Sequence, residues 1–468
     1  MKNLPVAVIG AGPIGLAAAA HLINRGIPVK VYEAGDAVAT NIRDWGHVHL
    51  FSPWRYNIDP VGRALLAGTA WHDPNGDTCP TGADLVADYL EPLSRVPAMA
   101  SVIEFGARVT AIGRSGIDKI SSRDRGQYPF VLTVVGRAGV RRDLARAVID
   151  ASGTWSSPNP LGGSGLPADG EATHAKRIAY GIPDVLGRDR SDYAGRTTLV
   201  FGAGHSAANV LLDLVALSLE AADTRAIWVT RGTDLSRVYG GGANDQLPGR
   251  ADLGQCLKEQ VESGQIGLIT GFAAETIREE GDRLIVEGAA PSGRQTIGPA
   301  DRIVVCTGQR PDLALTREVR VDLDPWLESV RALGPMIDPN LHSCGSVPPH
   351  GHREVSHPEP GFYTVGIKSY GRAPTFLMLT GYEQVRSVVA AIAGDMDAAN
   401  DVRLVLPETG VCRANPSSAV ISCDSGSPAM PPAISEVASA IEEKAGCCRP
   451  SASAPKPAPA LNCCENAT

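Results

Sequence analysis

Short apolar runs alternate with stretches of helical length along much of this 468-residue chain. Residues 6–9 are apolar throughout, residues 14–23 are rich in alanine and leucine, and residues 29–32 form the next strand-like run. A short run that is apolar at every position is typical of a parallel strand with both faces buried. The order therefore predicts a strand, a helix and a second strand at the N-terminus.

The same order returns in the second half of the chain. A strand-like run at 198–201 leads into a leucine-rich helical stretch, and another strand is expected at 226–230. Each half continues with strands that end in small residues, ASGT in the first and CTGQRP in the second. Two dinucleotide-binding units in one chain explain this repeat. The other expected elements are strands at 107–112, 130–136, 147–149, 272–277, 283–287, 302–305 and 363–366, and helices at 81–95, with Thr81 as N-cap, and at 381–393.

A glycine fingerprint follows the first strand. Gly10, Gly12 and Gly15 have the spacing GxGxxG, and Glu33 follows the second strand. The first glycine permits the tight turn, the second lets the backbone approach a pyrophosphate, and the third lets helix and strand pack closely. The helix begins at Pro13, and the residues of its first turn after this proline offer free N–H groups to a phosphate. Because a carboxylate can accept hydrogen bonds from both ribose hydroxyls, Glu33 completes a predicted dinucleotide site.

A second fingerprint, GxGxxA, follows the strand at 198–201, and here a cation rather than an acid follows the next strand. A guanidinium suits a 2′-phosphate, and a charge-assisted hydrogen bond of this kind contributes about 1.5–3 kcal/mol. The second unit is therefore predicted to bind NADPH rather than NADH; the alternative is a solvated loop charge. The residues expected to bind this cofactor are Gly202, Gly204, His205, Ser206, Ala207 and Arg231.

Small residues after the other strands let the backbone pass close to a bound dinucleotide, and the N-terminus of the last helix is placed to face a flavin carbonyl. The further cofactor-binding residues expected are Val109, Ser152, Gly153, Thr307, Gly308, Gly366 and Tyr382.

Residues 41–56, NIRDWGHVHLFSPWRY, interrupt the α/β pattern with many aromatic side chains. Such a segment can line a flat ring cofactor and its substrate; the alternative is core packing beneath a long loop. The predicted lining of the reaction chamber is Trp45, His47, Trp54, Lys368, Ser369, Tyr370 and Arg372.

The net charge of −8 and the lack of a basic run argue against a nucleic-acid partner. The sequence has no window of about 18 uninterrupted apolar residues, so no membrane span is predicted. The apolar N-terminal stretch is assigned to the fingerprint rather than to a signal peptide, because cleavage would destroy the fingerprint. A cytoplasmic protein is expected.

Six of the ten cysteines lie in the last 57 residues, within a segment, 406–468, whose Ala, Pro and Ser content predicts a flexible tail. In a reducing compartment this placement indicates thiol chemistry or soft-metal capture rather than a disulfide scaffold. The candidate thiols for a trivalent metalloid are Cys344, Cys447, Cys448, Cys463 and Cys464, with Cys306 weighed beside Cys344 and a structural role as the alternative for both.

A further group of potential metal ligands lies between residues 342 and 357. Its spacing matches no standard zinc site, so a loop or site lining is expected and no resident metal is predicted. The group comprises His342, Cys344, His350, His352 and His357.

Together, GAGPIG, ASGTWSSPNP, GAGHSAAN and CTGQRP resemble the two-dinucleotide flavoprotein monooxygenases over roughly residues 1–400. Within that group, WGHVHLFSPW, YGIPDVLG, VYGGG and GIKSYGRAPTFLMLTGYEQVRS are similar to flavin-dependent methylarsenite-oxidising enzymes of arsenic-resistance operons. The resemblance implies an α/β fold with two Rossmann-like domains that bind FAD and NADPH. The implied domains are 1–160 (FAD, first part), 161–310 (NADPH), 311–405 (FAD, returning part) and 406–468 (tail).

The resemblance also implies an activity: oxidation by O2 of a soft small-molecule nucleophile, most simply a trivalent (methyl)arsenical, through a flavin C4a-(hydro)peroxide. Two departures stand out. The fingerprint FxGxxxH of many related enzymes is absent, and the Gly-Asp pair of disulfide reductases is replaced by Gly366–Ile367. The alternatives are an NADPH-dependent flavoprotein reductase acting on thiols or an electron-transfer partner, and a metalloid-binding redox sensor without turnover. No Cys pair flanks either fingerprint, which disfavours the reductase.

Overall fold

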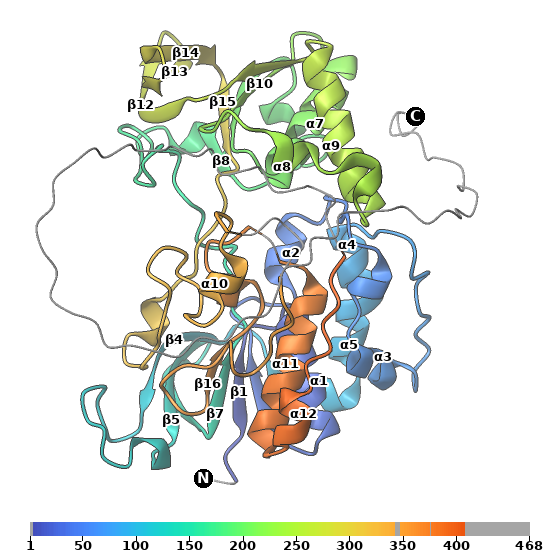
Figure 1. The fold of residues 1–468 in the computed structure, drawn as a ribbon, viewed down its shortest axis with the longest axis vertical. Helices are drawn as coiled ribbons and strands as arrows, with labels where there is room; N and C mark the ends of the chain where they lie inside the picture. The colour runs from blue at the N-terminus through green and yellow to red at the C-terminus, as the bar shows by residue number, and fades with distance from the viewer. Residues whose placement is uncertain (1–2, 342–346, 375, 408–468) are drawn as a thin grey trace, which may run out of the picture. The chain divides into compact units, whose positions relative to one another are not determined.

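The computed structural model describes residues 3–341, 347–374 and 376–407 (Figure 1). The predictions for Cys344, for both vicinal cysteine pairs and for residues 408–468 lie outside the described residues and rest on the sequence.

The first unit is built on a parallel sheet with the strand order β16 (Phe362–Thr364), β7 (Ala147–Asp150), β1 (Val6–Ile9), β2 (Val29–Tyr32) and β3 (Ile103–Glu104). The central strand β1 pairs with β2, where Val6 lies opposite Val29, and with β7, where Val6 lies opposite Ala147. All four residues of β1 are buried, because both faces of the sheet are covered.

The second unit repeats this topology with the strand order β8 (Ile178–Tyr180), β15 (Arg302–Val305), β9 (Thr197–Phe201), β10 (Arg225–Val229) and β11 (Ile266–Ile269). The strands of the two sheets correspond in position: β9 takes the central place that β1 has in the first sheet, β10 corresponds to β2, and β15 corresponds to β7. The chain leaves the first sheet after β7 and returns to it with β16. The predicted α/β fold with two Rossmann-like units is confirmed.

Each unit carries a three-stranded antiparallel sheet: β4 (Arg108–Arg114), β5 (Phe130–Gly136) and β6 (Gly139–Ala145) in the first, and β12 (Ala273–Glu280), β13 (Arg283–Ala290) and β14 (Gly293–Ala300) in the second. The sequence missed β6 and β14. Both are edge strands with mostly exposed residues, so they lack the apolar alternation that reveals a strand.

The α-helices of the described residues are α1 (Pro13–Asn24), α2 (Thr40–Asp44), α3 (Pro60–Leu66), α4 (Gly82–Leu85), α5 (Glu91–Arg95), α6 (Pro97–Ala100), α7 (His205–Glu220), α8 (Ser236–Tyr239), α9 (Pro248–Glu262), α10 (Gly334–Ile337), α11 (Met378–Ala393) and α12 (Met396–Asn400). The alanines of α1 from Ala17 to Ala20 are fully buried, and α1 packs against α11 (Figure 1).

The helix predicted at 81–95 is interrupted. It begins as expected, because Thr81 and Asp84 form a capping box with hydrogen bonds of 3.0 and 2.9 Å. Between α4 and α5 the chain forms a π-helical turn, η2 (Val86–Leu90). Pro92 has no N–H to donate, and the Asp88 carbonyl accepts a hydrogen bond from Trp71 Nε1 at 2.6 Å instead.

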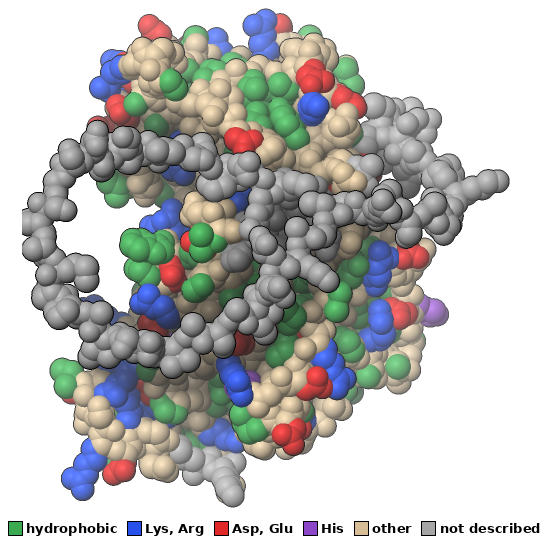
Figure 2. Space-filling view, viewed as in Figure 1, with side chains coloured by type: hydrophobic (Ala, Val, Ile, Leu, Met, Phe, Trp, Pro, Cys, Tyr) green, Lys and Arg blue, Asp and Glu red, His purple; other side chains and the backbone are tan. Residues whose placement is uncertain are grey.

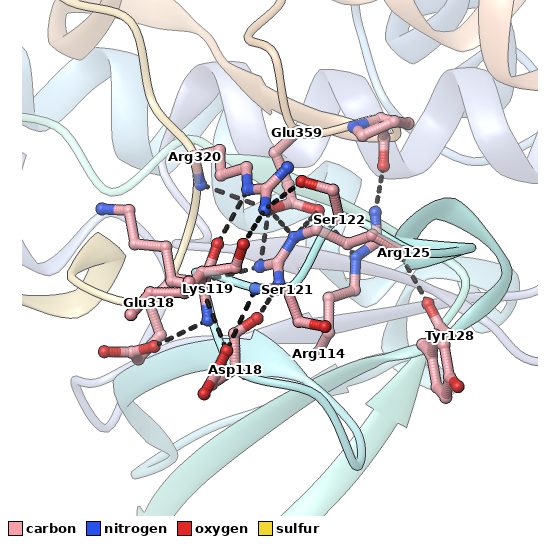
Figure 3. A network of polar contacts seen from close by, with 12 residues as sticks. Arg114, Asp118, Lys119, Ser121, Ser122, Arg125, Tyr128, Glu318, Arg320 and Glu359 are labelled. Atoms are coloured by element: carbon pink, nitrogen blue, oxygen red, sulfur yellow. Dashed lines mark hydrogen bonds and ion pairs between the residues drawn. The ribbon is translucent and has the colours of Figure 1, made fainter.

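A buried ionic network joins β4 to the returning segment of the first unit (Figure 3). The Glu359 carboxylate accepts from Arg114 Nε at 2.8 Å and from Arg125 Nε at 2.9 Å, and all three side chains are almost fully buried. The Arg320 N–H adds a third donor at 3.2 Å. Because each charge is paired and hydrogen-bonded, this network fixes the chain just before β16.

Charged side chains of both signs are interspersed over the face of the molecule in Figure 2. Among the described helices, none combines the length and the apolar character needed to cross a membrane.

Candidate functional site

The first glycine fingerprint forms an open cradle at the start of α1. Gly10 has a φ of +97°, and a Cβ added there would lie 2.8 Å from the Ala151 carbonyl oxygen. A Cβ at Gly15 would meet the Gly10 carbonyl, whereas a Cβ at Gly12 would have no atom within 4 Å. Gly12 is the N-cap of α1, and no side chain caps the helix. Free N–H groups beside this open space fit a pyrophosphate.

Glu33 is held beside this cradle. Its Oε2 accepts a hydrogen bond from the Ala11 N–H at 2.7 Å, and its Oε1 accepts from the Gly35 N–H at 2.8 Å. These donors fix the carboxylate and leave further lone pairs for the hydroxyls of a ligand. The cradle therefore fits a dinucleotide, with the Glu33 carboxylate free to accept from ribose hydroxyls and with open space at Gly12 for a pyrophosphate.

The second fingerprint has the same geometry. Gly202 has a φ of +134° and packs against the Cys306 carbonyl, as the first glycine of the other unit packs against the residue after β7. A Cβ at Gly204 would meet no atom within 4 Å, and Gly204 is the uncapped N-cap of α7. Ala207, in the third position, is fully buried. The second cradle therefore fits a nicotinamide dinucleotide.

His205 and Ser206 begin α7 beside this cradle. The His205 Nε2 is buried and has no hydrogen-bond partner. Burial lowers the pKa of His205 to about 4, so its imidazole is neutral at pH 7. The ring of Phe51, from the aromatic segment of the first unit, lies 5.1 Å from the His205 ring. The structure thus brings that segment against the second fingerprint.

Arg231 follows β10, as the sequence predicts. Its side chain is exposed, and Nη1 donates to the Gly163 carbonyl at 2.8 Å. One hydrogen bond leaves four N–H donors of the guanidinium for a ligand. The preference for NADPH over NADH stays a prediction.

The turn η8 (Gly366–Tyr370) lies against the first cradle. Gly366 has a φ of +70°, and a Cβ added there would lie 3.2 Å from the side chain of Ile14 in the first turn of α1. A Cβ at Gly153 would lie 4.0 Å from Ile367. The structure therefore brings three predicted cofactor contacts, Gly12, Gly153 and Gly366, to one edge of the first sheet.

Lys368 is bound within this turn rather than free. Its Nζ lies 2.8 Å from Asp150 Oδ2 and donates to Ser152 Oγ at 2.9 Å. Both charged side chains are buried. Lys368 is therefore an anchor between η8 and the end of β7, and Ser152, predicted to bind the cofactor, is part of this anchor. Ser369 is also buried and donates to the Gly366 carbonyl at 2.7 Å.

Tyr370 is fully buried, with its ring centroid 5.2 Å from that of Phe376 and 5.8 Å from that of His350. Arg372 follows in an exposed position. The structure places Tyr370 in the packing behind η8 and Arg372 at the surface, so the two do not form one cluster.

The tryptophans of the aromatic segment have different environments. Trp45 is half-buried, its ring centroid 6.4 Å from that of Trp155, whose Nε1 donates to Asp44 at 3.0 Å. Trp54, in η1 (Trp54–Tyr56), is buried in the core of the first unit. Core packing, the alternative weighed for this segment, therefore describes Trp54.

His47 is half-buried, and its Nε2 lacks a hydrogen-bond partner. Burial lowers its pKa, against the opposing effects of Asp184 and Asp189. Within the described ranges, no hydrogen bond, ion pair or ring contact joins Trp45 or His47 to residues 368–372. The predicted chamber residues thus form separate groups.

Two predicted cofactor contacts are core residues. Tyr382 is 2% exposed and its hydroxyl donates to the Asn57 carbonyl at 2.7 Å. Val109 is buried in the core under the first antiparallel sheet. Thr307 and Gly308 lie where the two connections between the units run side by side, with the Thr307 hydroxyl 3.1 Å from the Asn159 carbonyl.

Cys306 is a structural residue. Its thiol donates to the Gly181 carbonyl at 3.2 Å, and burial raises its pKa to about 12. The part of the chain that the structure describes holds no group of three or more His, Cys, Asp or Glu side chains arranged as metal ligands. Instead, His352 Nδ1 is hydrogen-bonded to the Ala399 carbonyl and His357 Nε2 to the Thr364 hydroxyl.

Sequence reasoning missed Asp150, His350 as a polar anchor, Gln384, Phe51 and Trp155. Asp150 carried a signal as an acid at the end of an apolar strand, and Phe51 lay in the aromatic segment predicted to line a ring cofactor. The roles of the others depend on contacts between segments far apart in the chain.

Residues 8–68 match the family model described as "NAD(P)-binding Rossmann-like domain". The chain is 23% identical to ferredoxin–NADP reductase of Lactococcus lactis subsp. cremoris over 251 residues, which are 53% of this chain and 64% of that protein. It is 25% identical to indole-3-pyruvate monooxygenase YUCCA6 of Arabidopsis thaliana over 213 residues, 44% of each chain. The matched regions thus span less than two thirds of these relatives.

Solved structures share the whole fold. Bacillithiol disulfide reductase Bdr from Bacillus cereus superposes with a TM-score of 0.62 and 20% identity, covering 84% of this chain and 99% of its own. The cadaverine monooxygenase DfoA from Erwinia amylovora, bound to FAD, superposes with a TM-score of 0.61 and 11% identity, covering 88% and 99%. The chain therefore has the two-dinucleotide-binding fold of FAD- and NAD(P)-dependent oxidoreductases.

Proposed function

We propose that the chain is an FAD-containing, NADPH-dependent monooxygenase that oxidises a soft nucleophile, a trivalent (methyl)arsenical, to its pentavalent form. The choice of an arsenical as the substrate rests on the resemblance of residues 45–54 and 366–387 to enzymes of arsenic-resistance operons. The oxidoreductase class and both cofactors agree with the reported relatives and structural neighbours.

One observation carries the proposal: the two cradles are alike in backbone but opposite in charge. Each has an open second glycine, Gly12 or Gly204, at an uncapped helix N-terminus. The carboxylate of Glu33 follows β2, whereas the guanidinium of Arg231 follows β10. A carboxylate repels a 2′-phosphate and a guanidinium attracts it, so FAD belongs to the first unit and NADPH to the second.

FAD, when bound, supplies the redox and oxygen chemistry. The protein's part is to bind and orient the reactants and to exclude water. The Lys368 ammonium is occupied by Asp150 and orients η8 rather than moving a proton. The N–H groups at the start of α7, which no side chain caps, are the donors we assign to a dinucleotide phosphate, and His205 adds no positive charge beside them. Trp45 and Trp155 supply an aromatic wall for the substrate side.

A thiol-directed reductase is the second candidate, because a bacillithiol disulfide reductase shares the fold. Two of the described cysteines speak against it: Cys79 is exposed, whereas the Cys306 thiol is buried against the Gly181 carbonyl, so these two do not form a redox pair. For the vicinal cysteines of the tail we propose capture and delivery of the arsenical, since chelation by two thiols releases their protons. Replacing all four by serine leaves the apparent affinity for methylarsenite unchanged if they have no such role.

The deciding experiment measures NADPH and O2 consumption by FAD-loaded protein, with and without methylarsenite, followed by arsenic speciation. Equimolar consumption stimulated by methylarsenite, with a pentavalent product, supports the proposal. Equal NADPH oxidation without it, yielding only peroxide, refutes the substrate, and NADPH-dependent reduction of a low-molecular-weight disulfide would favour the reductase. Gly204→Ala is the matched control, because it should weaken NADPH binding by about tenfold or more while FAD stays bound.

A further inference from the structure

A chain of buried polar groups lies directly behind the first cradle. Gln384 in α11 is fully buried, and its Oε1 accepts a hydrogen bond from the Gly366 N–H at 2.8 Å. Its Nε2 lies 3.0 Å from Ser369 Oγ and 3.2 Å from His350 Nε2. The Tyr370 hydroxyl lies 3.5 Å from the same His350 nitrogen.

These contacts determine the protonation state of His350. Its Nδ1 lies 3.0 Å from the Pro348 carbonyl, which can only accept, so Nδ1 carries a proton. The Gly366 N–H can only donate, so the oxygen of Gln384 must face it and the amide NH2 must face His350. Nε2 must therefore be an unprotonated acceptor, and the imidazole is neutral.

The other end of this chain reaches the cofactor site. Gly366 packs against Ile14, the second residue of α1, and a Cβ at Gly381 in α11 would also meet Ile14. Gly366 has a positive φ, which glycine adopts readily, and the hydrogen bond from its N–H to Gln384 fixes the peptide in this orientation. The network thus supports the wall of the cradle that Gly12 opens.

We propose that His350 is a positioning residue for FAD, which acts through Gln384 to hold the Gly366–Ile367 peptide against the first cradle. The inference rests on FAD binding to the first unit, as proposed above, but not on the oxygenation reaction.

Protonation of His350 would disrupt this arrangement. A proton on His350 Nε2 would point at the side-chain NH2 of Gln384, which is also a donor. Rotating the Gln384 amide by 180° would relieve that contact but would place its NH2 against the Gly366 N–H, again two donors. Burial lowers the pKa of His350, while Glu354 on its own segment and Glu383 on α11 oppose this shift, and Tyr370 on η8 is uncharged. FAD should therefore be bound above the ordinary imidazole pKa of about 6.5 and released as the pH falls well below it.

The test compares FAD binding, measured by flavin fluorescence and absorbance, for the wild-type chain and three variants. His350→Phe removes the acceptor and should weaken FAD binding at pH 7.5 by about tenfold or more, the effect of one buried hydrogen bond. His350→Gln restores a non-titrating acceptor and should bind FAD like the wild type at pH 7.5, without the acid-induced release. His352→Gln, on the same segment, is the matched control and should keep the wild-type pH profile.

A double variant separates positioning from general damage. If His350 acts through Gln384, His350→Phe should weaken FAD binding no further once Gln384→Leu is present. NADP+ binding to the second unit, followed in the same samples, reports whether each variant is folded. The inference would be overturned if His350→Phe bound FAD with wild-type affinity and absorbance, or if His350→Gln still released FAD in acid as the wild type does. Either result would leave the proposed function standing. A folded wild-type chain that does not bind FAD would overturn the proposed function as well.

Discussion

Lys368 Nζ lies 2.8 Å from Asp150 Oδ2, and neither side chain is exposed to solvent. Ser152 completes the arrangement, because its hydroxyl lies within hydrogen-bonding distance of both partners, 2.9 Å from Lys368 and 2.7 Å from Asp150. The pair joins the end of β7 to η8, so the outgoing and returning parts of the first unit meet in one buried ionic contact.

Breaking this pair should destabilise the first unit. Lys368→Met leaves the Asp150 carboxylate buried and unpaired, which should lower the free energy of unfolding by about 3–5 kcal/mol in urea titrations. Lys368→Met combined with Asp150→Leu should recover part of that loss. Arg137→Ala breaks the exposed pair with Asp36 and should cost less than about 1 kcal/mol. Equal losses for Lys368→Met and Arg137→Ala would contradict the buried role.

The two glycines at the first cradle should separate folding from binding. Gly12 has a φ of −79° and open space at its Cβ position, so Gly12→Ala should leave the melting temperature unchanged but weaken FAD binding by about tenfold or more. Gly10→Ala forces a side chain into positive φ and against Ala151, so it should lower the melting temperature. The reverse ranking in a thermal melt would refute the assignment of the two glycines.

Arg231→Ala should act on one cofactor only. Loss of a charge-assisted contact of about 1.5–3 kcal/mol predicts that kcat/KM for NADPH falls about 10–150-fold, while that for NADH stays constant. Arg225→Ala removes an exposed cation at the opposite end of β10 and serves as the control. A parallel fall with NADPH and NADH would mean that Arg231 does not contact the 2′-phosphate.

The Glu359 network should make the free energy of unfolding fall at acid pH. Burial alone would raise the pKa of Glu359, but hydrogen bonds from Arg125 and Arg114 outweigh it and hold the pKa below its usual value. A depressed carboxyl pKa contributes stability above the unfolded value of about 4.3, and this contribution is lost as the pH falls below it. Glu359→Gln should therefore destabilise the chain at pH 7 and flatten the decline in acid. Glu280→Gln, at an exposed site, should do neither.

Cys306 should resist alkylation in the folded chain. Because burial raises its pKa to about 12, almost no thiolate is present at pH 8, whereas the exposed Cys79 should react with iodoacetamide. Peptide mass spectrometry should find the Cys306 label only at urea concentrations that unfold the second unit. Rapid labelling of Cys306 in buffer would show that it is accessible to a metalloid after all.

Much of the fold could be predicted from local patterns. GxGxxG after an apolar strand specifies a turn, a helix start and an open phosphate site, since each depends on residues within a few positions. Glu33 and Arg231 likewise follow strands whose ends were readable. The interrupted helix at 81–95 was not readable as such: Thr81 marked its start, but the π turn depends on Pro92 together with a distant tryptophan.

By itself, the sequence determined two dinucleotide units, their order and the opposite charges of Glu33 and Arg231 after their second strands, because these properties are encoded in short spacings. Only the tertiary structure decided which polar residues serve the site. Lys368 lies 216 positions from Ser152 and contacts it, and Gln384 joins His350 to Gly366. The physical reason is burial: a charged or polar group in the interior must find its partner wherever the fold places one.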